Sequence, residues 1–140
     1  MPNPAPSRRD FIKTTSAVAV AVPLIGRAAY AGGSDQLKIG LVGCGGRGGG
    51  AVLQALHADP GTVLWAIGDA FADQAEALPG QIHQEEPNLD ATRIQLPAER
   101  RFSGLDCYKK VVDAVDVVLF ASPPGFRPMQ IDYAVNAGKH

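Results

Sequence analysis

The sequence predicts an α/β fold, a doubly wound parallel sheet with helices on both faces. Short apolar runs alternate with helical stretches along residues 37–140. A glycine-rich turn joins the first apolar run to the first helical stretch. The run at 115–121 is rich in β-branched and aromatic residues, as is typical of a buried strand. Together these observations favour parallel strands, because parallel neighbours need long crossover connections such as helices.

The first predicted strand covers residues 37–42 and leads into a G-x-G-x-x-G motif at residues 43–48. A helix is predicted over residues 51–58. This order of strand, glycine turn and helix is the setting that a dinucleotide-binding fingerprint requires. A glycine turn without a ligand is the alternative, because the motif alone is weak and six of the residues from 43 to 50 are glycine.

The three motif glycines have different expected roles. Gly43 permits a tight turn out of the strand. Gly45 has no Cβ, so the backbone can approach a pyrophosphate, and Gly48 lets the helix pack close to the strand. The free N–H groups at the start of the helix would then face the phosphate charge.

The second predicted strand covers residues 62–69 and ends in an acidic residue. Asp69 lies 21 residues after Gly48, close to the ~20 expected for a carboxylate that binds a ribose. This spacing favours nucleotide binding over a purely structural turn. An acid at this position also favours NAD, because it repels a 2′-phosphate, while Arg47 leaves NADP open.

The segment after the second strand is predicted to be less regular. A short helix is expected over residues 71–78, ended by the Pro-Gly pair at 79–80. Residues 81–98 contain two further prolines and mixed polar residues, so we expect a surface excursion with little regular structure. A very short third strand is expected at 100–102.

The last part of the chain returns to the alternating pattern. Asp106 is expected to cap a helix over residues 107–114, and the strong strand at 115–121 follows. The turn at 122–125 then lies at the carboxyl edge of the sheet, where open α/β sheets bind ligands.

A final helix is predicted to begin near Pro128 and to continue from 129 to 137. Gly138 is suited to end it, because glycine readily adopts the left-handed conformation found after helices. Beyond this point we expect another strand, and therefore that residues 37–140 are the N-terminal part of a nucleotide-binding domain in a longer protein.

Four stretches of the sequence together resemble the glucose–fructose oxidoreductase, inositol dehydrogenase and rhizopine-catabolism (Gfo/Idh/MocA) family. They are residues 39–48, the strand ending at Asp69, residues 102–110, and residues 116–128 together with 134–140. The Ser-Pro-Pro turn paired with Ala-Gly-Lys-His is more specific than the glycine motif. The resemblance implies a Rossmann-type nicotinamide-nucleotide domain, followed in the family by a second α/β domain that holds the substrate and the oligomer contacts.

The resemblance carries over cofactor contacts only. The positions that match are the fingerprint glycines Gly43, Gly45 and Gly48, the pyrophosphate-facing Gly46 and Arg47, the ribose acid Asp69, and Ala121, Ser122 and Pro123 beside the cofactor. The family often has histidine or asparagine just after that turn, whereas this chain has Gly125 and Arg127. The usual catalytic lysine belongs to a Glu-Lys-Pro motif that would follow His140, so the catalytic residues are unknown.

The N-terminal residues resemble an export signal rather than part of the domain. Residues 7–13 are similar to a twin-arginine motif, with Ile12 where leucine is usual, and an apolar stretch follows at 17–26. That stretch is shorter than the ~20 residues that span a bilayer. An Ala-x-Ala cleavage site lies at 29–31. We expect a signal peptide over 1–31 and a linker over 32–36, with a disordered N-terminus or an uncleaved anchor as alternatives.

Composition limits the other possibilities. The net charge of −1 gives no electrostatic case for nucleic-acid binding. Cys44 and Cys107 are the only cysteines and do not have a metal-binding spacing, so we expect both to be unpaired and no metal site.

Export constrains the expected function. The twin-arginine route carries folded proteins, and free nicotinamide cofactor is scarce outside the cytoplasm, so the cofactor should be loaded before export and retained. The main hypothesis is a periplasmic or otherwise exported NAD(P)-dependent oxidoreductase acting on a sugar or cyclitol, with a homo-oligomeric full-length form. A redox-neutral NAD-dependent glycoside hydrolase or lyase is the second hypothesis, and a non-catalytic nucleotide-binding fragment is the third.

Overall fold

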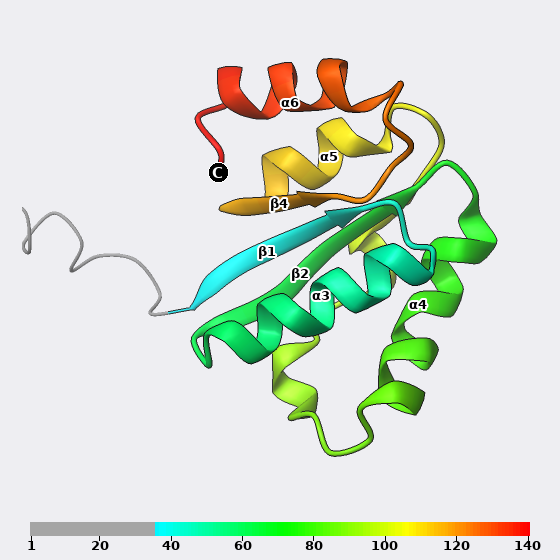
Figure 1. The fold of residues 1–140 in the computed structure, drawn as a ribbon, viewed down its shortest axis with the longest axis vertical. Helices are drawn as coiled ribbons and strands as arrows, with labels where there is room; N and C mark the ends of the chain where they lie inside the picture. Colours follow the sequence, from blue (N-terminus) through cyan, green and yellow to red (C-terminus); the bar gives the residue numbers. More distant parts are fainter. Residues whose placement is uncertain (1–35) are drawn as a thin grey trace, which may run out of the picture. The chain divides into compact units, whose positions relative to one another are not determined.

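The computed structural model describes residues 36–140, which form a four-stranded parallel sheet covered by helices (Figure 1). The order of strands across the sheet is β3-β2-β1-β4. The predicted doubly wound parallel fold is therefore confirmed. The expected signal peptide and nearly all of the expected linker lie outside the described residues. Within residues 36–140, no helix has the length and apolar character needed to cross a membrane.

The strands match the sequence predictions closely. β1 (Leu37–Val42) and β2 (Thr62–Asp69) have the predicted bounds, and β3 (Arg101–Ser103) is as short as expected. β4 (Val117–Phe120) is shorter than the predicted run of 115–121 and only half-buried. Its position at the edge of the sheet explains this exposure, because β1 pairs with only one of its sides.

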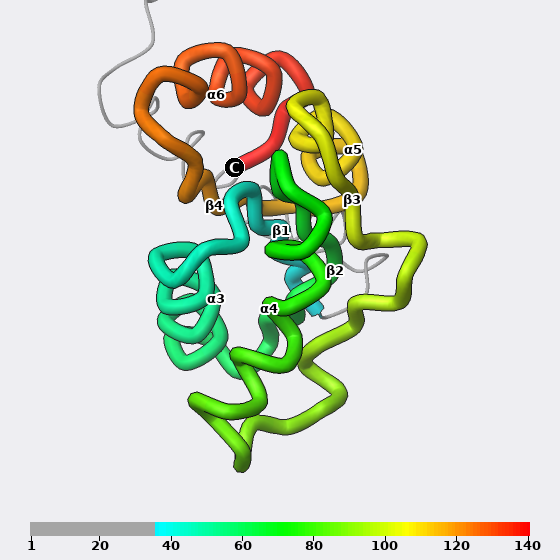
Figure 2. Tube along the Cα trace, turned by 90° about the vertical axis from the view of Figure 1, so that its right-hand side faces the viewer, coloured from blue at the N-terminus to red at the C-terminus, as the bar shows by residue number. Residues whose placement is uncertain are grey.

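Helices cover both faces of the sheet (Figure 2). On one face, α3 (Gly46–Ala58) and α4 (Ala72–Glu85) pack on side chains of β1 and β2. On the other, α5 (Cys107–Ala114) packs against the sheet, and α6 (Arg127–Asn136) lies beside it. The larger core includes Ile39, Leu41, Val52, Leu56, Leu64, Ile67, Leu78 and Ile82.

The first helix begins earlier than predicted. The sequence indicated a start at residue 51, whereas α3 begins at Gly46 and includes the glycines up to residue 50. Glycine disfavours a helix interior by roughly 1 kcal/mol relative to alanine. Here Val52 and Leu56 are fully buried against the sheet, and this packing outweighs the low local propensity.

The second helix ends later than predicted. The sequence placed its end before the Pro-Gly pair at 79–80, but α4 continues through Pro79 to Glu85. Leu78 and Ile82 are four residues apart, share one face and are both fully buried. Their burial explains why the helix tolerates the loss of the backbone hydrogen bond that Pro79 cannot make.

The predicted excursion is more ordered than expected. It contains two short 3₁₀ helices, Ala91–Arg93 and Ala98–Arg100, and an isolated bridge joins Ile94 to Leu64 of β2. The Arg93 guanidinium donates to the carbonyl oxygens of Asp59 (Nη2, 2.7 Å) and Thr62 (Nε, 3.0 Å). These bonds fasten the excursion to the start of β2.

The last two helices lie close to their predicted positions, but the predicted side-chain cap by Asp106 is wrong. Asp106 stands at the N-cap position of α5 but makes no cap hydrogen bond there. Instead its carboxylate pairs with Lys109 at 3.0 Å. Pro128 lies in the first turn of α6, and Gly138 adopts a φ of +68°, the left-handed conformation expected after the helix end.

Candidate nucleotide-binding site

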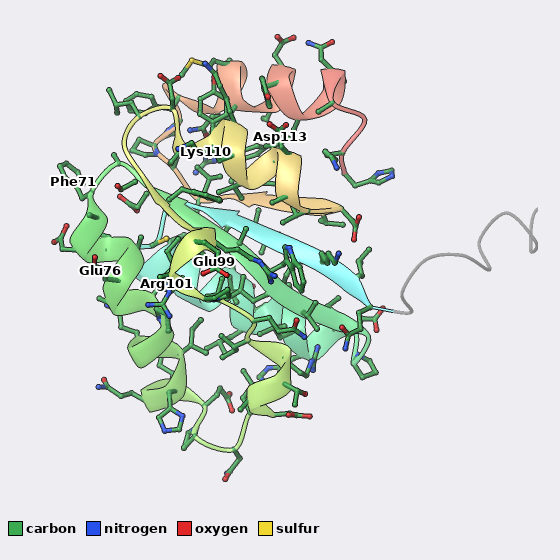
Figure 3. The ribbon with its side chains drawn as sticks, turned by 180° about the vertical axis from the view of Figure 1, so that it is seen from behind. Phe71, Glu76, Glu99, Arg101, Lys110 and Asp113 are labelled. Atoms are coloured by element: carbon green, nitrogen blue, oxygen red, sulfur yellow. The ribbon has the colours of Figure 1, made fainter. Side chains whose placement is uncertain are left out.

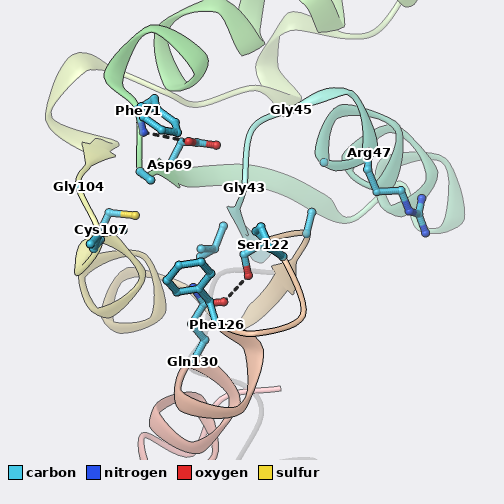
Figure 4. A pocket seen from close by; sticks show the side chains of 16 residues that line it. Gly43, Gly45, Arg47, Asp69, Phe71, Gly104, Cys107, Ser122, Phe126 and Gln130 are labelled. Atoms are coloured by element: carbon cyan, nitrogen blue, oxygen red, sulfur yellow. Dashed lines mark hydrogen bonds between the residues drawn. The ribbon is translucent and has the colours of Figure 1, made fainter.

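A cavity of about 440 Å³ opens at the carboxyl ends of the strands (Figure 4). Its walls come from the glycine turn after β1, the residues from Asp69 to Phe71, the loop after β3 and the turn after β4. Because β2 and β4 lie on opposite sides of β1, the connection after β1 runs to one side of that strand and the connection after β3 crosses to the other side. Such a switch point is where open α/β sheets bind their ligands.

The glycine turn is shaped by close backbone contacts. Gly43 has a φ of +99°, and a Cβ at this position would meet the Ala121 carbonyl carbon and the Ser122 nitrogen at 2.8 Å. A Cβ at Gly48 would overlap the carbonyl oxygen of Gly43. Both glycines are therefore required for the close approach of α3, β1 and the turn after β4.

The start of α3 is open to a ligand. Gly45 is its N-cap and provides no side-chain cap, and the first turn has no acidic residue. A Cβ on Gly45 or Gly46 would meet nothing within 4 Å, so there is free space above this backbone. Uncapped N–H groups at a helix start attract anions, particularly phosphates.

Asp69 joins the end of β2 to the glycine turn. Its carboxylate accepts a hydrogen bond from the Cys44 N–H at 2.6 Å and a second from the Phe71 N–H at 3.0 Å. An ionised carboxylate has about four acceptor positions, so capacity remains for the hydroxyl groups of a ribose. The residue predicted to bind ribose therefore lies at the cavity beside the predicted phosphate loop.

The predicted contact residues gather at this cavity, with Gly46 as the exception. Those that line it are Gly43, Gly45, Arg47, Gly48, Asp69, Ala121, Ser122 and Pro123. The side chain of Arg47 extends away from the cavity (Figure 4) and also lines a second hollow over β4. This orientation gives no support to a salt bridge between Arg47 and a 2′-phosphate beside Asp69.

The two cysteines are unpaired, as predicted, and both are buried. Burial, reinforced by the nearby Asp69 carboxylate, raises the pKa of the Cys44 thiol to about 12 and that of the Cys107 thiol to about 11. Both thiols are therefore neutral at physiological pH, and neutral thiols are poor nucleophiles. Cys107 lines the cavity and Cys44 belongs to the buried core, so neither supplies a nucleophile to the site.

Several lining residues were not identified from the sequence. Phe71 and Leu105 are exposed apolar side chains at the mouth of the cavity, and Phe71 projects outward in Figure 3. Phe126 and Gln130 come from the start of α6. Phe71 had a usable signal, an aromatic residue directly after the acid-ended strand, whereas nothing in the sequence places Gln130 beside Ser122.

No protein-family model and no curated protein matches the chain, but solved structures do. An NAD-binding oxidoreductase from Klebsiella pneumoniae matches with a TM-score of 0.54 and 25% identity, over 76% of this chain and 26% of that chain. Scyllo-inositol dehydrogenase from Lactobacillus casei, solved with NAD(H) and scyllo-inositol, matches with a TM-score of 0.51 and 26% identity. The match covers 75% of this chain and 26% of that chain.

A structure named as a putative myo-inositol dehydrogenase, from Sinorhizobium meliloti, shares the fold at 22% identity, with a TM-score of 0.51 over 74% of this chain and 26% of that one. The chain thus spans about a quarter of the length of the structures it matches. It is distantly similar to NAD-binding oxidoreductases of the Gfo/Idh/MocA type, and its sheet is Rossmann-like.

Proposed function

We propose that this chain binds a nicotinamide dinucleotide, NAD in preference to NADP, as the cofactor-binding part of an oxidoreductase acting on a sugar or cyclitol. One observation carries the proposal. The switch-point cavity brings together the uncapped start of α3, the Asp69 carboxylate and the turn at 121–123. The similarity to an inositol dehydrogenase that binds NAD(H) supports the choice of cofactor and of substrate class.

The residues of the cavity have separate roles in this proposal. The N–H groups of Gly45 to Gly48 would hold the pyrophosphate, and Asp69 would accept hydrogen bonds from the ribose of the adenosine half. The second nucleoside would lie along the turn after β4. When bound, the cofactor supplies the hydride chemistry, while the protein orients it and keeps water away.

We assign no proton-transfer residue within the cavity. Its polar side chains among the described residues are Arg47, Asp69, Cys107, Ser122 and Gln130, with neither histidine nor lysine. In this proposal, the group that moves the proton accompanying hydride transfer comes from outside this cavity.

Calorimetric titration of the full chain with NAD⁺ and NADP⁺ tests the cofactor assignment. We expect NAD⁺ to bind at least ~10-fold more tightly, because the Asp69 carboxylate would repel a 2′-phosphate. Absence of binding to either dinucleotide would overturn the proposed function. Tighter binding of NADP⁺ would overturn the preference alone.

We further propose that the protein is exported by the twin-arginine route with its cofactor retained. The support is the order of motif, apolar stretch and cleavage site in residues 7–31. In a bacterial host, changing Arg8 and Arg9 to lysine should leave the chain in the cytoplasm, while the parent chain reaches the periplasm. Equal export of both proteins would contradict this. Exported parent protein should release NAD when denatured.

A further inference from the structure

A buried polar pair lies in the wall of the cavity on the β4 side. The Ser122 hydroxyl donates to the Gln130 Oε1 oxygen at 2.5 Å (Figure 4). Ser122 follows β4, Gln130 lies at the end of the first turn of α6, and both line the cavity. Gln130 is only 4% exposed, which is unusual for a glutamine.

The Gln130 amide nitrogen has hydrogen-bonding capacity left over. Its oxygen accepts from Ser122, but its Nε2 donates to no other residue in the described part of the chain. A glutamine Nε2 carries two donor hydrogens. Among residues 36–140, no fully enclosed side-chain nitrogen or oxygen lacks a partner, so this nitrogen keeps some access to solvent. Because Gln130 lines the cavity, a ligand there is within the reach of this donor.

The position of Gln130 determines which part of a dinucleotide it would meet. Asp69 lies at the end of β2, the glycine turn follows β1, and Ser122 with Gln130 lies on the far side, next to β4. A dinucleotide whose adenosine ribose binds Asp69 and whose pyrophosphate binds the glycine turn places its second nucleoside on the β4 side. That nucleoside carries acceptor oxygens on its ribose and its carboxamide.

We propose that Gln130 is a specificity residue, whose amide N–H donates to the second nucleoside of the dinucleotide while Ser122 holds its oxygen. This inference rests on the proposed nucleotide function. It implies that the chain distinguishes a complete dinucleotide from its adenosine half. The Arg127 side chain holds the Ser122 backbone in place, since its Nε donates to the Ser122 carbonyl oxygen at 2.8 Å.

The test compares NAD⁺ with ADP, which lacks the second nucleoside, by calorimetry on the full chain. Gln130→Met removes the amide at similar volume and should weaken NAD⁺ binding about 10-fold while changing ADP affinity less than about 2-fold. Gln130→Glu keeps an oxygen that can accept from Ser122 and replaces the N–H donor with a carboxylate oxygen, which adds a negative charge at pH 8. This variant should show the same selective loss of NAD⁺ affinity over ADP affinity, even if the methionine variant folds poorly. Gln54→Met, on the exposed face of α3, is the matched control and should change neither affinity.

The possible results separate this inference from the proposed function. If the parent chain binds NAD⁺ but both Gln130 variants lose affinity for NAD⁺ and for ADP by the same factor, Gln130 only supports the fold and the inference is wrong. Unchanged NAD⁺ affinity in both variants would also overturn it. If the parent chain binds neither NAD⁺ nor ADP, the proposed function itself fails, and this inference fails with it.

Discussion

At the scale of single residues, the carboxylate of Asp69 combines a structural and a binding role. It accepts hydrogen bonds from two backbone N–H groups, one in the glycine turn and one just after β2. Hydrogen bonds to a charged acceptor contribute more than neutral ones, about 1.5–3 kcal/mol each. A change at Asp69 should therefore alter both the folding stability and the nucleotide affinity.

Asp69→Asn separates these two roles. The asparagine keeps one acceptor oxygen but loses the charge, so we expect the free energy of unfolding to fall by about 1–3 kcal/mol. The affinity for NAD⁺ should fall by roughly 10-fold or more. The affinity for NADP⁺ should fall less, because the repulsion of its 2′-phosphate is removed. Urea denaturation and calorimetry measure the two effects. Asp132→Asn, at an exposed site on α6, is the control. An unchanged NAD⁺/NADP⁺ ratio would contradict the ribose assignment.

The buried thiols predict a pH dependence of stability. The pKa of Cys44 is about 12 in the folded chain, above its ordinary value of 9.0. As the pH rises above about 9, the unfolded chain loses this proton while the native chain keeps it, so the free energy of unfolding falls. We expect urea midpoints to decrease between pH 8 and pH 10, and to decrease less in Cys44→Ala. Equal slopes in the two proteins would show that other groups cause the effect.

At the scale of elements, the glycines of α3 differ in their roles although they are neighbours in the sequence. A Cβ at Gly48 would overlap the Gly43 carbonyl oxygen, whereas one at Gly50 would meet nothing within 4 Å. Gly48→Ala should therefore destabilise the chain by about 3 kcal/mol or more, because α3 must move away from β1. Gly50→Ala should stabilise it by about 0.5–1 kcal/mol through helix propensity. Urea denaturation of both variants measures this contrast. An equal change in the free energy of unfolding would contradict the close approach of Gly48 to the Gly43 carbonyl oxygen.

The boundaries of the helices show where local sequence signals stop being sufficient. The strands at 37–42 and 62–69 could be predicted because apolar composition and turn residues agree there. The start of α3 and the end of α4 could not, since glycine and Pro79 signal helix breaks locally. In both helices, burial against the sheet outweighed the local preference, and that burial depends on residues far away in the sequence.

At the scale of the whole molecule, the same distinction applies to the candidate site. The glycine turn and Asp69 could be found from the sequence because a fixed spacing along the chain defines them. The cavity also includes Leu105 after β3 and Gln130 on α6. Only the order of strands in the sheet brings these to the switch point. Their roles depend on tertiary neighbours, which no short motif encodes.

Because its cavity is assembled from segments between Val42 and Gln130, the site should exist only in the folded chain. A ligand that binds only the native state stabilises it by mass action, by about 2.7 kcal/mol at a ligand concentration 100 times its Kd. We expect NAD⁺ at that concentration to raise the Tm by roughly 10 °C for a domain of this size. NADP⁺ at the same concentration should raise it less.

Differential scanning calorimetry over a series of NAD⁺ concentrations measures this coupling. Asp69→Asn should require more NAD⁺ for the same rise, which links the thermal shift to the cavity rather than to a general salt effect. Sodium pyrophosphate at equal ionic strength is the second control and should give a smaller rise, since it occupies only the glycine turn. Calorimetric binding of NAD⁺ without any rise in Tm would mean that the unfolded chain binds it equally well, and the assembled cavity would then not be the binding site.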